Sequence, residues 1–292
     1  MLYDVRLRID YGYATPADGG RTLLRIMPPP LTGAQEVLAA SVGIDPAPDE
    51  RREHSDFFGN AVTEIAFRQP LDHLRLSLRA RLRRRAEPER LDLSPPVAGL
   101  AAEIAGTGLE PLSPRHFLGA SDRVRPTREM TDWARAQVRD DMSALEALVA
   151  LSSALHAEMR FDPGATDAGT RPEDAFAARH GVCQDFSHVL IACLRGLGMP
   201  AGYVSGLLRT EPPPGQPRLE GADAMHAWVM AWCGTELGWV GHDPTNACFA
   251  GTDHLVIARG RDYADIAPVR GWLRIAGAQS SGQAVDVLPV GA

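Results

Sequence analysis

HGVCQDFSH, residues 180–188, is the stretch of this 292-residue chain that decides its fold. Beyond its glycine and cysteine, apolar residues recur at the spacing of a helix, at Phe186, Val189, Leu190, Cys193, Leu194 and Leu197. Gly196, Gly198 and Pro200 would end that helix. Cys183 is therefore predicted in the first turn of an amphipathic helix, where unpaired backbone N–H groups and the helix dipole favour a thiolate.

Two other interpretations of this segment are weighed against a nucleophile. A cysteine at a helix start can simply be buried, and the local sequence alone does not separate that case from a reactive thiol. A zinc site of His180, Cys183 and His188 is disfavoured by geometry. His188 follows Cys183 by five positions, which is roughly 140° around a helix of 3.6 residues per turn, so the two cannot easily share a metal.

A strand pair downstream of this helix could supply a base and an acid that orients it. Residues 224–232 alternate as a strand, and residues 237–242 are predicted to be the next one. We expect a two-residue turn within residues 233–236, because glycine at its first central position fits a type II′ turn. That register sets His226 directly opposite Asp243, as a pair whose Cβ atoms lie about 4.5–5.5 Å apart and can hydrogen-bond through their side chains. A longer loop would change the register.

The composition narrows the class of protein. Apolar residues make up 45% of the chain and charged residues 23%, as in ordinary soluble domains. A net charge of −7 argues against non-specific nucleic-acid binding, and no apolar run approaches the roughly 20 residues that span a bilayer. Residues 1–8 alternate in polarity, unlike a signal peptide, so we expect a cytoplasmic protein with no nucleic-acid or membrane partner. Four cysteines without a C-x-x-C pair do not make a disulfide scaffold, and Cys193 is predicted to be buried.

Residues 1–90 are predicted to form a β-rich domain. Alternating or β-branched stretches predict strands at 2–13, 21–27, 61–67 and 74–82. Clusters of proline and glycine separate them, which is typical of a small antiparallel sandwich. The arginine-rich run at 79–90 alternates with leucine and alanine in its first half, and this predicts a solvated strand at the edge of the sheet.

The pattern changes to helical spacing after about residue 95. Helices are predicted at 97–104, 127–138 and 143–159, the last with Ser143 as its N-cap. We therefore expect a helical segment at 91–160 that leads into a mixed core at 161–292.

Several ordered segments resemble those of a known family. They are residues 181–188, 226–229 and 241–246, a later run at 254–266, and residues 56–60 in the β-rich domain. Together they look like the motifs of the bacterial transglutaminase-like superfamily and its N-terminal region, over nearly the whole chain. The resemblance implies an α+β fold, with an N-terminal antiparallel β-sandwich followed by a papain-like core. In that core the helix carrying the nucleophile packs against an antiparallel sheet.

The same resemblance implies roles for three residues. Cys183 would be the nucleophile, His226 the general base and Asp243 the acid that orients it, in agreement with the hairpin argument. The backbone N–H of Cys183 is expected to be one oxyanion donor. Candidates for the second donor, or for support around the triad, are Gln184, Asp185 and Trp228.

Other residues near these motifs are not assigned to catalysis. His242 is adjacent to Asp243, so its side chain is expected on the opposite face of the strand. His188 is predicted to be structural. His242 and Met230 also depart from the aromatic and acidic residues that relatives often have at these positions, and both could alter substrate choice.

These residues predict acyl transfer through a thioester, with a peptide or protein as substrate. Water as the second nucleophile would make the protein a cysteine peptidase or amidase, which we favour, and an amine would make it a crosslinking transglutaminase. The alternative from another class is a non-catalytic peptide-binding module. No metal or organic cofactor is implied, the oligomeric state is left open, and specificity is expected from the loop at 209–222 and from the junction between the domains.

Overall fold

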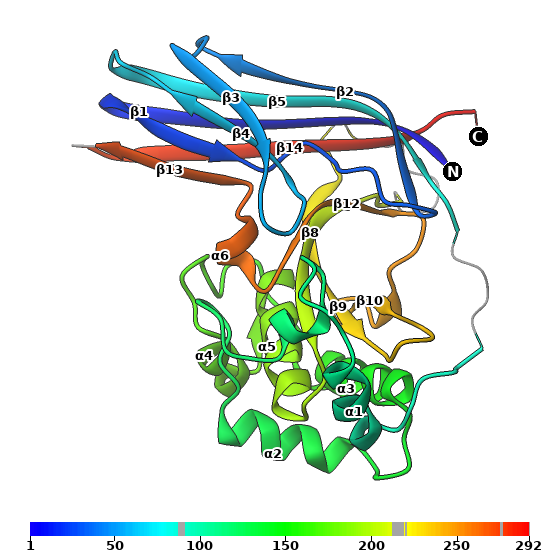
Figure 1. Ribbon diagram of the computed structural model, residues 1–292. Coiled ribbons are helices and arrows are strands. Elements are labelled where there is room, and N and C mark those ends of the chain that lie inside the picture. The colour runs from blue at the N-terminus through cyan, green and yellow to red at the C-terminus, as the bar shows by residue number, and fades with distance from the viewer. Residues whose placement is uncertain (87–90, 212–218, 220, 275–276, 292) are drawn as a thin grey trace.

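A computed structural model describes residues 1–86, 91–211, 219, 221–274 and 277–291. The fold class is confirmed as α+β, with an antiparallel sheet built mainly from the N-terminal residues and a mixed core beneath it. Figure 1 shows this sheet lying across the core strands, with the larger helices gathered on the far side of the core and a short helix at Tyr263–Ile266 next to the sheet. Within the described residues no helix is long and apolar enough to cross a bilayer.

The N-terminal sheet is organised by one long strand. This strand, β1 (Leu2–Leu24), pairs along its first half with β5 (Leu71–Arg84) and β14 (Gln279–Pro289), and along its second half with β4 (Ala61–Ala66) and β13 (Val269–Arg274). The outer strands are β2 (Gln35–Asp45) and β3 (Glu50–Ser55). Alternate apolar side chains of β1, such as Tyr3, Val5 and Leu7, are buried on one face, so the period of two predicted a half-buried strand correctly.

Two expectations for this sheet are corrected. The predicted strand at 21–27 is the end of β1, and β2 and β3 were not predicted at all. The arginine-rich strand is also not an edge strand, because β5 lies between β2 and β1. Arg75, Arg79, Arg81 and Arg83 project from the solvent face, where Arg75 pairs with Asp10 at 2.6 Å and Arg81 with Asp4 at 2.7 Å across to β1. Arg84, at the end of the strand, is buried. The part of the run at 87–90 lies outside the described residues.

The core combines a five-stranded antiparallel sheet with a helical layer. The strand order is β11 (Cys248–Phe249), β10 (Trp239–Asp243), β9 (Ala224–Trp232), β8 (Ala201–Leu208) and β12 (His254–Gly260). The helices are α1 (Leu100–Ala105), α2 (Arg128–Gln137), α3 (Ala144–Glu158), α4 (Pro172–Ala178), α5 (Cys183–Gly196) and α6 (Tyr263–Ile266), with 3-10 turns at Val97–Gly99 and Pro114–Phe117. A short parallel pair, β6 (Arg160–Phe161) and β7 (His180–Gly181), precedes α5.

Local sequence signals account for the main helices. Ser143 caps α3 as predicted, since its hydroxyl accepts from the N–H of Glu146 and the Glu146 carboxylate accepts from the N–H of Ser143. The apolar stripe of α5 is buried against β9 and α2, and Cys193 within it has no exposed surface, as predicted. Burial raises the pKa of Cys193 to about 12, so this thiol stays protonated.

The hairpin between β9 and β10 differs from its predicted register. Trp232 pairs with Trp239, and the Cys233 N–H donates to the Gly238 carbonyl at 2.9 Å. The loop closed by Cys233 and Gly238 therefore has four residues, 234–237, instead of two. Gly234 within it and Gly238 at its end have positive φ, and the direct pairing of His226 with Asp243 is wrong by two positions. A shift of two residues keeps every side chain on its predicted face, because strand side chains alternate with period two.

The two sheets are joined into one body. Leu207 of β8 and Leu255 and Ile257 of β12 belong to the same apolar cluster as the inner face of the N-terminal sheet. Strands β13 and β14 pair with β1, so residues 269–274 and 279–289 of the expected core segment lie in the N-terminal sheet.

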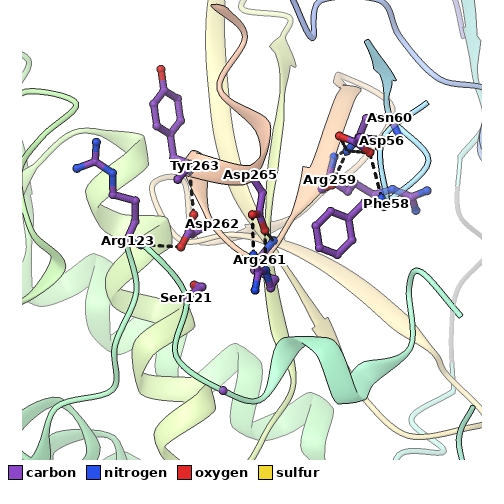
Figure 2. Close-up of polar contacts among 12 residues, drawn as sticks. Asp56, Phe58, Asn60, Ser121, Arg123, Arg259, Arg261, Asp262, Tyr263 and Asp265 are labelled. Carbon is purple, nitrogen blue, oxygen red and sulfur yellow. Dashed lines mark hydrogen bonds and ion pairs between the residues drawn. The ribbon is translucent and has the colours of Figure 1, made fainter. Parts of the chain in front are cut away.

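A turn of the N-terminal sheet is also tied to the core strand β12. The side-chain amide of Asn60 donates to the Arg259 carbonyl and its oxygen accepts from the Arg259 N–H, both at 2.8 Å. Asp56 holds this turn by accepting from the N–H groups of Phe58 and Asn60 at 3.0 Å (Figure 2). The Asn60 side chain thus pairs with the backbone of β12 as a neighbouring strand would.

Candidate active site

Cys183 is the first residue of α5 and is half-buried. The residue before it, Val182, is extended, and its N–H donates to the Asp185 carboxylate at 2.8 Å. Asp185 also accepts from the Thr166 hydroxyl at 2.6 Å. These contacts fix the entry of the chain into the helix, and they leave Cys183 in the first turn, where backbone N–H groups have no partner within the helix.

His226 and Asp243 form a buried pair. His226 Nε2 lies 2.7 Å from Asp243 Oδ2, and both side chains are almost fully excluded from solvent. His226 and Cys183 line the same pocket. Because Nε2 faces the carboxylate, Nδ1 is the ring nitrogen left for the thiol. The structure thus brings together the three residues that the sequence singled out.

Asp243 holds more than one partner. Its Oδ2 also accepts from His254 Nε2 at 3.2 Å and from the Asn246 side-chain amide at 2.7 Å, and its Oδ1 accepts from the Thr245 N–H at 2.9 Å. The Gly251 N–H donates to His254 Nδ1 at 3.2 Å, so His254 carries its proton on Nε2 and donates it to Asp243. His254 and Asn246 at this carboxylate were not predicted from the sequence.

The pair has strongly shifted pKa values. Burial by itself would lower the pKa of His226, but hydrogen bonds to Asp243 and Cys183 and their negative charges outweigh it and raise the pKa to about 10. Burial would raise the pKa of Asp243, yet its bonds from His226 and His254 lower it well below the usual range. At neutral pH the site therefore holds an imidazolium beside a carboxylate.

A pocket of about 260 Å³ opens at Cys183 and His226. Its walls come from both parts of the molecule, with Tyr203 and Tyr263 from the core and Tyr11 from β1 of the N-terminal sheet. Apart from His226 and Cys183, the described residues lining it carry no side chain that is ionised at neutral pH. It therefore suits an uncharged group such as an amide.

The remaining predicted site residues lie around this centre in different ways. Gln184 lines the pocket but donates to the Ala168 carbonyl at 3.4 Å, and Asp185 holds the start of α5. Trp228 is buried behind the two imidazoles, with ring centroids 6.3 Å from His226 and 5.2 Å from His254. None of these contacts identifies a second oxyanion donor.

The two histidines that were set aside are buried away from the thiol. His242 contacts the Ser152 hydroxyl at 2.8 Å under α3, and burial lowers its pKa to about 4. His188 accepts from the Tyr263 N–H at 3.2 Å, and burial lowers its pKa to about 3. Both rings are neutral at pH 7 and pack inside the core.

One group of side chains could in principle hold a metal. His226, Asp243 and His254 place their ligand atoms within 4.8 Å of one another. However, the 2.7 Å between His226 Nε2 and Asp243 Oδ2 is a hydrogen-bond distance. Two ligands of a tetrahedral zinc with bonds of about 2.0–2.1 Å lie roughly 3.3 Å apart, so the group fits a hydrogen-bonded network better.

Comparisons with known proteins agree with this geometry. The family model of the transglutaminase-like superfamily matches residues 131–244, and that of the bacterial transglutaminase-like N-terminal region matches residues 3–83. An uncharacterized protein of Mycobacterium tuberculosis is 33% identical over 285 residues, covering 92% of this chain and 86% of its own. One of Mycobacterium leprae is 29% identical over 269 residues, covering 89% of each chain.

A solved structure shares the fold over almost the whole length. It is a crystal structure from Cytophaga hutchinsonii, provisionally named a cysteine protease, with a TM-score of 0.76 and 21% identity over 98% of this chain and 90% of that one. The order of the motifs, the helix and sheet that carry them, and the matches to both family models lead to one conclusion. This chain belongs to the transglutaminase-like superfamily and carries the bacterial N-terminal region of that family ahead of the core.

Proposed function

We propose that the protein is a cysteine peptidase or amidase that hydrolyses peptide or amide bonds through a thioester on Cys183. Membership of the superfamily supports a cysteine-dependent enzyme. The observation that carries the finer proposal is the buried His226–Asp243 pair, whose histidine lines the same pocket as the thiol at the start of α5.

The first half of the reaction forms the thioester. The thiolate of Cys183 attacks the carbonyl carbon of the amide, and the carbonyl oxygen becomes an oxyanion that the backbone N–H of Cys183 can bind. The C–N bond then breaks, and imidazolium His226 gives its proton to the departing amine. Asp243 keeps the ring in place and stabilises its charged form.

The second half returns the enzyme to its starting state. Neutral His226 takes a proton from a water molecule as the oxygen attacks the thioester carbonyl. The C–S bond breaks, and the acid product leaves while the thiolate and imidazolium are restored. An amine in place of water would give a new amide, and this is the alternative transglutaminase reaction.

Two considerations favour water. The pocket at Cys183 is small and lined by residues that are uncharged apart from His226 and the thiol, so it provides no carboxylate to attract an ammonium group such as that of a lysine side chain. The fold is also shared with a protein provisionally named a cysteine protease.

The expected specificity loop is described only at its ends, since 212–218 and 220 lie outside the described residues.

The test is to trap and then partition the thioester. A peptide library or casein is incubated with the protein, and mass spectrometry follows acyl groups on Cys183 and the final products, with and without added primary amine. We expect free acid to dominate even in millimolar amine. Dominant amine incorporation would replace hydrolysis with transfer.

Matched variants separate catalysis from mere binding. Cys183→Ala and His226→Ala should each lower turnover by about 10³-fold or more. Cys248→Ala removes an exposed cysteine on β11 and should leave turnover unchanged. If all four proteins bind substrate but none acylates, the chain is a binding module instead.

A further inference from the structure

A second cavity lies on the face of the core sheet opposite α5. It has a volume of about 470 Å³, within the range of small-molecule sites. Trp228 and Met230 of β9 form its floor, whereas Ala227 and Val229, which alternate with them, pack against α5. The N-terminal region covers it with Leu31 and its neighbours. This cavity shares no lining residue with the pocket at Cys183.

The lining of this cavity combines apolar walls with positive charge. Trp228, Trp239 and Met230 provide the apolar surface. Among the described residues that line it, the charged ones are Arg84 and Arg259, and neither aspartate nor glutamate is present. Arg84 is 4% exposed and donates to the carbonyls of His254 and Ala34. The cavity therefore combines apolar walls with cationic side chains.

Arg259 is the residue that points most directly to such a ligand. The backbone carbonyl and N–H of Arg259 both hydrogen-bond with the Asn60 side chain. Its side-chain Nε, however, is buried without a hydrogen-bond partner in the described part of the chain. Burial lowers its pKa, but a guanidinium starts from so high a value that it stays charged at neutral pH. Arg259 is half-buried, and a buried donor such as its Nε is costly when it has no partner, a cost that a bound anion would remove.

We propose that this cavity binds a small organic carboxylate with an apolar body. The carboxylate would pair with Arg259, and the apolar body would lie against Trp228, Trp239 and Met230. Trp228 also packs against His254 and His226 on its other side, so the ligand would contact the residue that supports both imidazoles. This site does not depend on any chemistry at Cys183.

The experiment compares an acid with its neutral analogue. Isothermal titration calorimetry measures 4-phenylbutyrate and 4-phenylbutan-1-ol against the full chain, the Arg259→Gln variant and the Arg128→Gln variant. Arg128 lies on α2 with its side chain 95% exposed and serves as the matched control. We expect one saturable site for the acid, affinity at least tenfold weaker for the alcohol, and a tenfold or larger loss of acid binding in Arg259→Gln only. Alkylation of Cys183 should leave the acid affinity unchanged.

The opposite results overturn the site. They are no saturable binding of the acid, equal affinity for acid and alcohol, equal affinity of wild type and Arg259→Gln, or loss of binding after alkylation of Cys183. If Arg259→Gln does not fold, Ala250→Leu replaces it, because Ala250 lines the cavity and a larger side chain there fills it. That variant must weaken acid binding at least tenfold, and an unchanged affinity rejects the proposal.

Discussion

At the scale of single residues, the carboxylate of Asp243 organises the site. It accepts from two imidazoles, one side-chain amide and at least one backbone N–H while it has no solvent exposure. A buried carboxylate with this many donors stays ionised, and its charge is then available to hold His226 as an imidazolium. The proposed catalysis and the stability of the fold would consequently depend on the same hydrogen bonds.

The pKa of His226 predicts how stability changes at alkaline pH. A histidine whose pKa is about 10 when folded and about 6.5 when unfolded stabilises the protein fully below pH 6.5. This contribution falls between pH 6.5 and 10 and is absent above pH 10. The difference in melting temperature between wild type and His226→Gln should therefore shrink across that range. Calorimetry from pH 5.5 to 10.5 measures it, and a constant difference would contradict the raised pKa.

The hydrogen bond from His254 to Asp243 predicts how stability changes at acidic pH. The Nε2–H bond of His254 helps to lower the pKa of Asp243, so the stabilisation by this carboxylate, present above its unfolded pKa of about 3.9, is lost only at very low pH. His254→Phe removes the donor and should move acid unfolding to higher pH. His254→Gln can still donate from its amide and should restore most of the shift. Tryptophan fluorescence in an acid titration measures both, and equal behaviour of the two variants would rule out the hydrogen bond as the cause.

The site was partly predictable from local rules. The helix start at Cys183 follows from the spacing of apolar residues, and the common face of His226 and Asp243 follows from alternation. The loop length was mispredicted, but the error was an even number of residues and so preserved the face. His254 reaches Asp243 from β12, which is separated from β10 by two strands in the sheet, and no short-range pattern carries that information.

At the scale of elements, strand β8 is packed very closely by its neighbours in the core sheet. It lies between β9 and β12, and nearly all of its residues are buried. A Cβ atom at Gly206 would lie 2.3 Å from the Leu255 carbonyl oxygen and 2.3 Å from the Trp228 ring. Only glycine fits between that backbone and the indole that supports His226 and His254.

Gly206→Ala is accordingly expected to displace Trp228 and to destabilise the fold by about 2 kcal/mol or more, as overpacking of a core does. The matched control is Gly282→Ala in β14, where an added Cβ meets no atom within 4 Å. Urea unfolding measures both. A free energy of unfolding that falls equally in the two variants would show that the close approach at Gly206 is not the cause.

The helices and strands differ in how well their own sequences predict them. α3 and α5 combine an apolar stripe with clear start or stop signals, and both were predicted. β3 has the sequence ERREHS and is almost wholly exposed, so it lacks the alternation that marks a strand. The arginines of β5 suggested an edge, but the order of strands in a sheet is set by distant partners such as β2.

At the scale of the whole molecule, the two sheets act as one unit. They share an apolar cluster through Leu207, Leu255 and Ile257, and Asn60 adds two hydrogen bonds to the backbone of Arg259 (Figure 2). The pocket at Cys183 also takes walls from both sheets. The N-terminal region is therefore a structural part of the candidate site.

Asn60→Leu tests this junction. The substitution keeps the approximate volume but removes the partners of the Arg259 N–H and carbonyl, and each buried group left unpaired costs about 1–3 kcal/mol. We expect a loss of at least about 2 kcal/mol in the free energy of unfolding, measured in urea. Gln69→Leu changes an exposed amide in the same way and should have little effect. Similar losses in both would contradict a specific role for Asn60.

The pairing of β1 with β14 has a consequence for biosynthesis. A ribosome delivers β1 early, α5 with its thiol later and β14 last, whereas the pocket at Cys183 needs Ile9 from β1 and Gln283 from β14. A nascent chain that has already formed its helices still lacks one wall of this pocket. The lining of this pocket is thus complete only after β14 has been translated and has paired with β1.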